Sequence, residues 1–220
     1  MIRLLALAFP SALLLFAASG QAAAHKLLDS NYMIGKSGIG PARLGMTVDQ
    51  LKQDLGEDYT FRQVEDYLPD VDGIEVIYGG KVQYTLLFVA DEPQDKISWL
   101  VTSNPRFKFF GNLNTKALGP AYFGPGSKLA DLAADLGPPY LSFTNRGDKY
   151  EWIRFQNPGT GFPFNLALRA RLPEEKHASR VGVYPNQEER LKTGKLLFET
   201  EKFNPEAVIE SVWVSGDDSA

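Results

Sequence analysis

One motif occurs twice in this amino-acid sequence, and the repeat constrains the fold more than any other feature. The two copies span residues 38–56 and 119–137. When Gly45 is aligned with Gly126, the following positions coincide without a gap: Val48 with Leu129, Leu51 with Leu132, Asp54 with Asp135, Leu55 with Leu136, and Gly56 with Gly137. An internal repeat of this kind indicates that one supersecondary unit occurs twice.

The first copy is typical of a short capped helix. Thr47 and Gln50 have the spacing of a capping box, in which each side chain binds a backbone N–H group of the other residue. Gly56 can end the helix, because glycine adopts positive φ without steric cost. The apolar residues recur on one helical face: Val48, Leu51 and Leu55. A helix this short must pack against another element to be stable.

The second copy has the same pattern with a different start. Ser127 is the expected N-cap, Gly137 is the expected end, and the apolar face consists of Leu129, Leu132, Ala133 and Leu136. Neither glycine-rich stretch matches a nucleotide-binding loop. Gly38-Ile-Gly40 does not follow an apolar strand, and Gly124-Pro-Gly-Ser lacks the Gly-Lys-Ser/Thr of a phosphate loop. The repeat therefore predicts architecture and not a ligand.

Residues 1–24 are typical of a secretory signal peptide. Arg3 supplies a positive charge, residues 4–16 form an apolar run, and three alanines provide a cleavage site before His25. The apolar run is too short for a comfortable transmembrane helix, and the chain has no cysteine for a lipid anchor or a disulfide. We expect a periplasmic or secreted protein without a transmembrane segment or a lipid anchor.

The charge of the chain is unevenly distributed. The formal net charge of −4 argues against nucleic acid as a partner. Residues 25–103 carry 13 acidic and 7 basic side chains, whereas residues 104–220 carry 14 and 15. The acidic part either favours a basic partner or cations, or is simply a solvated surface.

Apolar and β-branched runs after each helix predict antiparallel strands. In the first unit these follow a polar connection over 57–72 and cover 74–78, 82–89 and 97–102, with Gly79-Gly80 as a hairpin turn. Trp99 is expected in the core, on one face with Ile97 and Val101. In the second unit the runs cover 149–155, 162–170, 196–198 and 207–215. Residues 103–111 are a linker containing phenylalanines, and residues 173–195 are a polar insertion.

These patterns predict an α+β protein made of two tandem repeats, each a short helix packed on an antiparallel β meander. Residues 25–103 form the first unit and residues 104–220 the second. The two units form either two domains or one continuous sheet.

No motif identifies an active site. The mature chain would hold two histidines, His25 and His177, without the partner spacing of a zinc site. We therefore expect no metal ion, no cofactor and no catalytic residue. An exported hydrolase that uses a pair of carboxylates is the alternative, because acidic residues are plentiful.

Strand alternation in the second unit predicts a face rich in aromatic and basic side chains. The candidate partner-binding residues are Tyr150, Trp152 and Arg154 on one strand, Asn165, Arg169 and Arg171 on the next, and Trp213, with Ser211 and Ser215, on the last. If the strands align, this face points away from the helix and carries the residue types that dominate protein interfaces. The alternative is an ordinary half-exposed sheet face with aromatic cross-strand pairs.

The segment 45–56, followed by β-rich runs and then repeated, resembles the superfamily of β-lactamase inhibitory protein. That superfamily also contains the small lipoprotein of the outer-membrane assembly machine. Residues 38–46, paired with the later Gly124-Pro-Gly-Ser, are similar to a family of envelope-stress-regulated lipoproteins. The resemblance covers both helices and the strand order. It implies a non-enzymatic envelope protein that binds other proteins, in the inhibitor through a concave sheet face. The missing lipid-attachment cysteine departs from both lipoprotein groups.

We therefore expect an exported protein-interaction or inhibitor-like module whose partner is another envelope or secreted protein. The hydrolase remains one alternative. The other is a carrier that holds a small apolar ligand between the two units, lined by the linker residues Phe107, Phe109 and Phe110.

Overall fold

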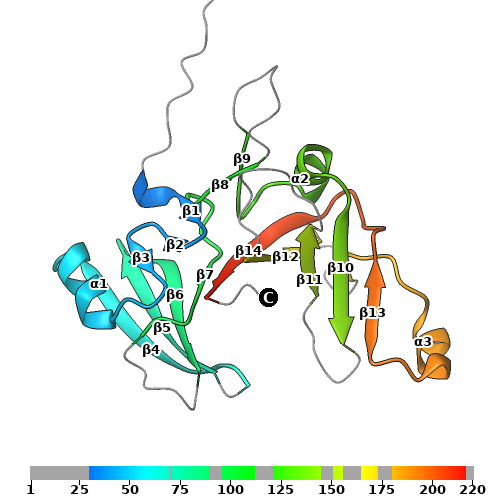
Figure 1. The fold of residues 1–220 in the computed structure, drawn as a ribbon, viewed down its shortest axis with the longest axis horizontal. Coiled ribbons are helices and arrows are strands. Elements are labelled where there is room, and N and C mark those ends of the chain that lie inside the picture. Colours follow the sequence, from blue (N-terminus) through cyan, green and yellow to red (C-terminus); the bar gives the residue numbers. More distant parts are fainter. Residues whose placement is uncertain are drawn as a thin grey trace, which may run out of the picture.

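A computed structural model describes residues 30–69, 71–89, 96–111, 121–144, 151–155, 165–172 and 180–216 (Figure 1). The expected signal peptide and its cleavage site lie outside the described residues. The described helices are α1 (Val48–Leu55), α2 (Leu129–Leu136) and α3 (Gln187–Thr193), together with a short 3-10 helix, η1 (Ser30–Tyr32).

The main sheet is antiparallel and has nine strands in the order β13-β10-β11-β12-β14-β7-β6-β5-β4. Its first four strands along the chain are β4 (Tyr59–Leu68), β5 (Val71–Tyr78), β6 (Lys81–Val89) and β7 (Trp99–Thr102). The others are β10 (Pro139–Thr144), β11 (Trp152–Phe155), β12 (Leu166–Arg171), β13 (Leu197–Thr200) and β14 (Val208–Ser215). Pairing of β7 with β14 joins the two repeats, so the sheet is continuous.

The predicted α+β class of two helix-plus-meander repeats is wrong. Among the described residues, 51% lie in strands and only 17% in helices, and one large sheet replaces two separate meanders. Two segments account for much of the difference. The expected polar connection over 57–72 contains the ten-residue strand β4, and residues 139–144, for which no strand was predicted, form β10. The predicted insertion over 173–195 also contains α3.

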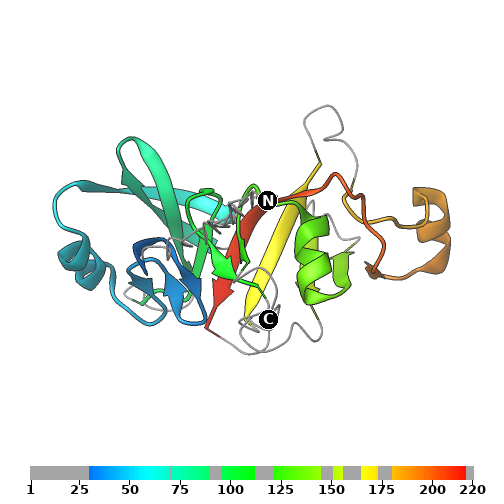
Figure 2. The same ribbon diagram turned by 90° about the horizontal axis from the view of Figure 1, so that it is seen from above.

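The two predicted helices are present, but only the first has the predicted cap. The Gln50 N–H donates to Thr47 Oγ1 (3.1 Å), and the Thr47 N–H donates to Gln50 Oε1 (2.9 Å). The N-cap of α2 is Lys128, which makes no side-chain capping bond. The prediction of Ser127 is wrong because its hydroxyl accepts from the Gly124 N–H (3.1 Å) one turn earlier. Figure 2 shows α1 beside the first half of the sheet and α2 beside the second.

The sequence repeat is reproduced in backbone hydrogen bonds that join each helix start to β14 or to the residues just before β7. The Gly45 N–H donates to the Ile97 carbonyl, and the Gly126 N–H donates to the Ile209 carbonyl, each at 2.8 Å. In this correspondence Ile97 is equivalent to Ile209, and Val101 is equivalent to Trp213.

The main core lies between the sheet and the helices. Leu51 of α1 and Leu132 of α2 are each fully buried in it, as are Leu86, Leu100 and Leu168 of the sheet. Phe107 and Phe109 of the linker also belong to this core, and Phe107 lines a pocket of about 190 Å³ together with residues of the first unit.

Two small sheets cover the helix side of the central strands. One comprises β1 (Ile34–Gly35), β2 (Gly38–Ile39) and β3 (Ala42–Arg43), and the other pairs β8 (Phe109–Phe110) with β9 (Tyr122–Phe123). At the predicted hairpin, Tyr78 pairs with Lys81, and both Gly79 (φ 57°) and Gly80 (φ 73°) have the positive φ that a two-residue turn requires.

Candidate protein-binding face

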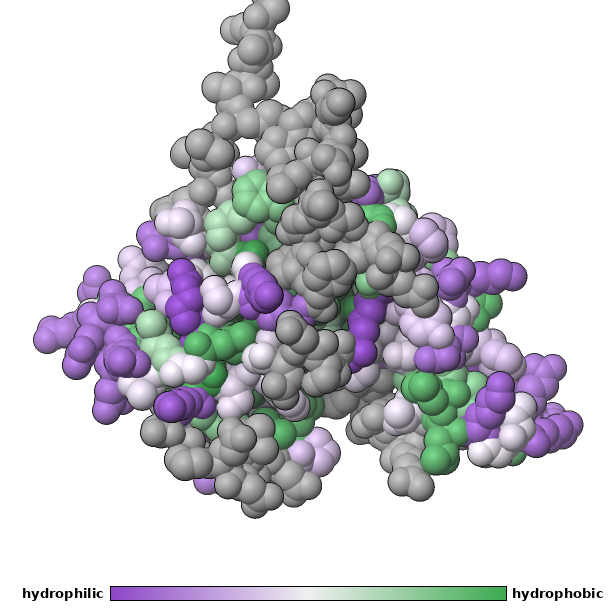
Figure 3. Space-filling model, viewed as in Figure 1, coloured by the Kyte–Doolittle hydropathy of each residue, from purple (hydrophilic) through white to green (hydrophobic). Residues whose placement is uncertain are grey.

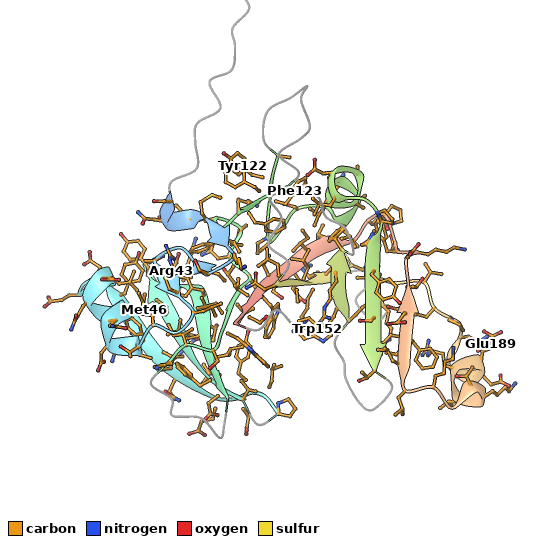
Figure 4. The ribbon with its side chains drawn as sticks, in the orientation of Figure 1. Arg43, Met46, Tyr122, Phe123, Trp152 and Glu189 are labelled. Atoms are coloured by element: carbon orange, nitrogen blue, oxygen red, sulfur yellow. The ribbon has the colours of Figure 1, made fainter. Side chains whose placement is uncertain are left out.

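A second apolar cluster lies on the face of the sheet opposite the helices. It buries Leu87, Val101, Ala167 and Trp213, and five half-buried residues pack against these: Tyr67, Leu68, Val71, Trp99 and Trp152. We call the aromatic members Tyr67, Trp99, Trp152 and Trp213 the tryptophan face. Figure 4 shows Trp152 on β11, near the centre of the molecule.

Strand register brings these side chains together. Trp213 pairs with Ala167 on one side and with Val101 on the other, and Trp99 pairs with both Ser215 and Leu87. Residues directly opposite each other in neighbouring strands share a face. The predicted alignment of Trp152 and Trp213 on one face is therefore what the register produces, across β11, β12 and β14.

The aromatic rings make specific contacts. Trp152 meets Trp213 edge to face, with ring centroids 5.2 Å apart and planes at 81°. The Trp213 indole N–H donates to Ser211 Oγ (2.9 Å), which satisfies the polar edge of this buried ring. The Tyr67 ring lies 6.1 Å from the Trp213 ring. Trp213 is thus the buried centre of the face, and Trp152, Trp99 and Tyr67 form its accessible surround.

The contact between Tyr67 and Trp213 shows that this face is concave. Their strands β4 and β14 are separated by β5, β6 and β7, which amounts to about 19 Å in a flat sheet with strands about 4.8 Å apart. Ring centroids only 6.1 Å apart therefore require that the β4–β5 end of the sheet curls over the face.

A bulge in β4 supplies part of this bend. Val64 pairs with Gly73 and Leu68 with Val71, so three residues of β4 lie opposite one residue of β5. Asp66 within the bulge has φ 50°, an uncommon value for a residue other than glycine, and its N–H donates to Asp72 Oδ1 (3.2 Å). Bulges bend strands and redirect side chains, and this one directs Tyr67 toward Trp213.

Three arginines accompany the tryptophans. Pairing of Ile153 with Leu168 sets Arg169 beside Trp152, and Arg169 lies 3.8 Å from the Glu210 carboxylate. Arg154 follows Trp152 by two residues on the same face, and Arg171 follows Arg169 in the same way. Both side chains are exposed and form no ion pair or hydrogen bond within the described part of the chain.

Two predicted site residues, Tyr150 and Asn165, are not placed on the tryptophan face. Tyr150 lies outside the described residues. Asn165 is only 5% exposed, and its Nδ2 donates to the carbonyls of Lys36 (2.8 Å) and Ser215 (2.6 Å). Asn165 therefore attaches the β1–β2 turn to the end of β14 and does not present a binding group.

Sequence reasoning missed two members of the face. Trp99 was expected in the core, on one face with Ile97 and Val101, but β7 begins only at Trp99 and strand alternation does not extend back to Ile97. Ile97 packs in the main core, whereas Val101 and Trp99 lie in the second cluster. Tyr67 was missed because β4 itself was not predicted. For Trp99, the available signal was its position next to Leu100 in a strand, because neighbouring residues of a strand point to opposite faces of the sheet.

A groove of about 680 Å³ adjoins the face on its first-half side. Among its lining residues are Tyr67, Glu75, Gln83, Thr85, Val101 and Asn104. Glu75 is bound by the guanidinium of Arg62 on the neighbouring strand. The groove extends the tryptophan face, because it shares Tyr67 with that face and Val101 with the apolar cluster beneath it.

A separate apolar surface lies at the other end of the sheet. Leu191 on α3 is 64% exposed, and Val183, Leu196 and Leu197 are exposed nearby. Figure 3 shows apolar surface there, next to charged residues of α3. This surface is a rival docking region that any binding experiment must distinguish from the tryptophan face.

The hydrolase hypothesis concerns pairs of carboxylates, and one buried carboxylate has a structural role. Glu151 is the one acidic side chain among them that is buried, and its two oxygens accept from the N–H groups of Val181 (2.9 Å) and Gly182 (3.0 Å). Its carboxylate therefore anchors the segment before α3. Within the described ranges, no three His, Cys, Asp or Glu residues are grouped so that they could hold a metal ion.

Comparisons with protein-family models, curated proteins and solved structures found no match for this chain. None of the described helices has the length and apolar character needed to cross a membrane.

Proposed function

We propose that this chain is an exported, non-enzymatic binding protein, whose tryptophan face contacts an acidic segment of another envelope or secreted protein. The observation that carries the proposal is the concave, half-buried aromatic cluster around Trp213, flanked by two exposed arginines. The resemblance to inhibitory proteins that bind through a sheet face is consistent with it.

The aromatic cluster has the features of a binding hot spot. Hot spots are enriched in Trp, Tyr and Arg, and they lie at protected centres surrounded by less important contacts. Trp152, Trp99 and Tyr67 are already held in place by their contacts with the second cluster. A partner would therefore bury large aromatic surfaces while little side-chain entropy is lost.

The charges on the face indicate the chemistry of the partner. Arg154 and Arg171 lie close to Trp152 and have no described carboxylate partner, whereas Arg169 is paired with Glu210. Complementary charge steers association and fixes register. An acidic loop or helix that inserts an apolar side chain beside Trp152 would satisfy both the aromatic and the basic parts of this face.

The test begins with affinity capture from envelope extract, followed by titration of the identified and purified partner. We expect Trp152→Ala to weaken binding about 30-fold, equivalent to about 2 kcal/mol, as at a typical hot spot. Trp213 is unsuitable for this test because it is only 6% exposed and its removal would damage the cluster. The matched control is Leu191→Ala on the rival surface.

Three results would contradict the proposal. The first is that no specific protein is captured. The second is that Trp152→Ala binds the partner as tightly as the wild type while circular dichroism shows both are folded. The third is that Leu191→Ala, and not Trp152→Ala, loses binding. Charge reversal by Arg154→Glu should also weaken binding and reduce its salt dependence, whereas Lys195→Glu beyond α3 should not.

The export part of the proposal has a separate test. Mass spectrometry of the protein purified from its native host should find a chain that begins at His25. A chain that retains residues 1–24 would contradict export.

A further inference from the structure

The groove beside the tryptophan face has the size of a ligand site and begins at the centre of that face. Its volume of about 680 Å³ lies within the range of about 300–1,000 Å³ that is typical of ligand sites. Strand register places its lining residues Glu75, Thr85 and Val101 in one row across the sheet, and the next residue in this row is Trp213. A chain bound over Trp213 can therefore continue into the groove.

From this row the groove extends toward the β5–β6 hairpin. On β6 its lining reaches from Thr85 to Lys81, and on the neighbouring segments it reaches past the strand ends to Gly79 and Pro105. The four residue steps from Thr85 to Lys81 span about 13 Å, at about 3.3 Å per residue. Because an extended peptide has the same rise, the groove accommodates about four residues of an extended chain.

The two ends of the groove differ in charge. In the row, the Glu75 carboxylate is neutralised by the Arg62 guanidinium. At the hairpin end, Lys81 and Arg106 line the groove, and neither forms an ion pair with a carboxylate in the described part of the chain. Arg106 is held in place by Tyr32, because its Nη2 donates to the Tyr32 hydroxyl and its guanidinium lies 4.1 Å from the centroid of that ring. This end therefore favours an anionic group.

The wall between the two ends is apolar and fixed in position. Tyr78 and Val82 line the groove and are 41% and 37% exposed. The amide groups of the wall are already bonded within the protein: Gln83 Nε2 donates to the Tyr78 and Lys81 carbonyls, and Asn104 Nδ2 donates to the Val82 carbonyl. A bound chain would therefore contact a preformed apolar wall, and its binding would order few side chains of the groove.

We propose that the groove binds the continuation of the partner's acidic segment as a short extended peptide, and that an Asp or Glu side chain of this peptide pairs with Lys81 and Arg106. This inference rests on the proposed function, because the peptide enters the groove from the tryptophan face. The length of the groove sets a spacing. The acidic residue lies about four positions from the residue that covers Val101.

The experiment selects peptides from a phage-displayed library of random sequences with the purified protein as bait. We expect enrichment of peptides in which Asp or Glu lies about four positions from an apolar residue. One enriched peptide is then synthesised, and its affinity is measured by isothermal titration calorimetry. Lys81→Glu should weaken its binding at least about tenfold, because like charges placed together at an interface are strongly unfavourable.

Two controls assign this loss to a single charge pair. Lys202→Glu, at an exposed lysine that does not line the groove, should bind the peptide as the wild type does. A second peptide carries Gln or Asn in place of the acidic residue and should bind the wild type more weakly. Lys81→Glu should weaken the binding of this neutral peptide far less, because the two changes remove the same interaction.

The outcomes separate the groove from the tryptophan face. The groove inference is overturned if no peptide is enriched, if the enriched peptides lack the spaced acidic residue, or if Lys81→Glu binds as tightly as the wild type. Binding that is lost in Trp152→Ala but unchanged in Lys81→Glu would overturn the groove inference and support the tryptophan face. Binding that is lost in Lys81→Glu but unchanged in Trp152→Ala would support the groove as a site and contradict the proposed role of the tryptophan face.

Discussion

Gly35 and Gly38 pair directly in the β1–β2 hairpin, yet their replacement by alanine should have opposite effects. Neither residue has positive φ, so backbone conformation does not distinguish them. A Cβ atom on Gly35 would meet nothing within 4 Å. A Cβ atom on Gly38 would lie 1.9 Å from the carbonyl oxygen of Ala42. The difference between the two variants is therefore steric.

The magnitudes follow from these distances. Side-chain Cβ atoms essentially never approach another heavy atom within 3.0 Å, so the β2–β3 turn would have to move by more than an ångström. Ala42 is fully buried, and such overpacking costs about 1–3 kcal/mol. In Gly35→Ala the unfolded chain loses conformational freedom, which stabilises the protein by about 0.4–1 kcal/mol. The two variants should differ by about 1.4–4 kcal/mol.

The measurement is urea unfolding followed by tryptophan fluorescence, with thermal unfolding as a second assay. At about 2–4 °C per kcal/mol for a chain of this size, Gly38→Ala should melt several degrees below Gly35→Ala. Equal free energies of unfolding for the two variants would refute the steric argument. It would mean that the β2–β3 turn accommodates a methyl group by a movement that the packing does not suggest.

Two further predictions concern the main core and alkaline pH. Leu132→Ala should lower the free energy of unfolding by about 2–5 kcal/mol, because Leu132 is fully buried. Ala134→Ser, on the exposed side of α2, should change the free energy of unfolding little. A loss below about half a kilocalorie per mole for Leu132→Ala would contradict the assignment of the helix face. Burial raises the pKa of Tyr84 above its ordinary value of 10.0, so the unfolded chain releases this proton first. The contribution of the protonated Tyr84 phenol to the free energy of unfolding is therefore fully present below pH 10, and it is lost as the pH rises beyond that value. Stability measured against pH should fall less steeply above pH 10 in Tyr84→Phe, and identical slopes would contradict this assignment.

Local sequence patterns predicted the elements whose stabilising contacts are close in sequence. The capping box of Thr47 and Gln50 and the stripe through Leu51 involve residues within two turns of α1, and the helix has the predicted bounds. Gly79-Gly80 forms its turn for the same reason. Ser127 failed as a cap because a competing local hydrogen bond, to the Gly124 N–H, holds its hydroxyl.

The strands that were not predicted lack a clear local signal. β4 is one of the two edge strands, and its exposed residues include Arg62, Gln63 and Glu65, so apolar alternation is weak there. It is a strand because β5 offers a partner. β10 begins at Pro139, two residues after the predicted helix end at Gly137, and the proline pair Pro138-Pro139 concealed the alternation of buried Leu141 and Phe143.

The sequence by itself determined the repeat, the two helices and the same-face pairing of Trp152 with Arg154. Only the tertiary structure decided that these residues form one concave face. Trp99 and Ser215 pair across more than a hundred residues of chain, and the contact of Tyr67 with Trp213 depends on the curl of four intervening strand pairs and on the bulge at Asp66. Such contacts depend on strand register and sheet curvature. These are set by long-range packing of the whole sheet, and no local pattern of residues encodes them.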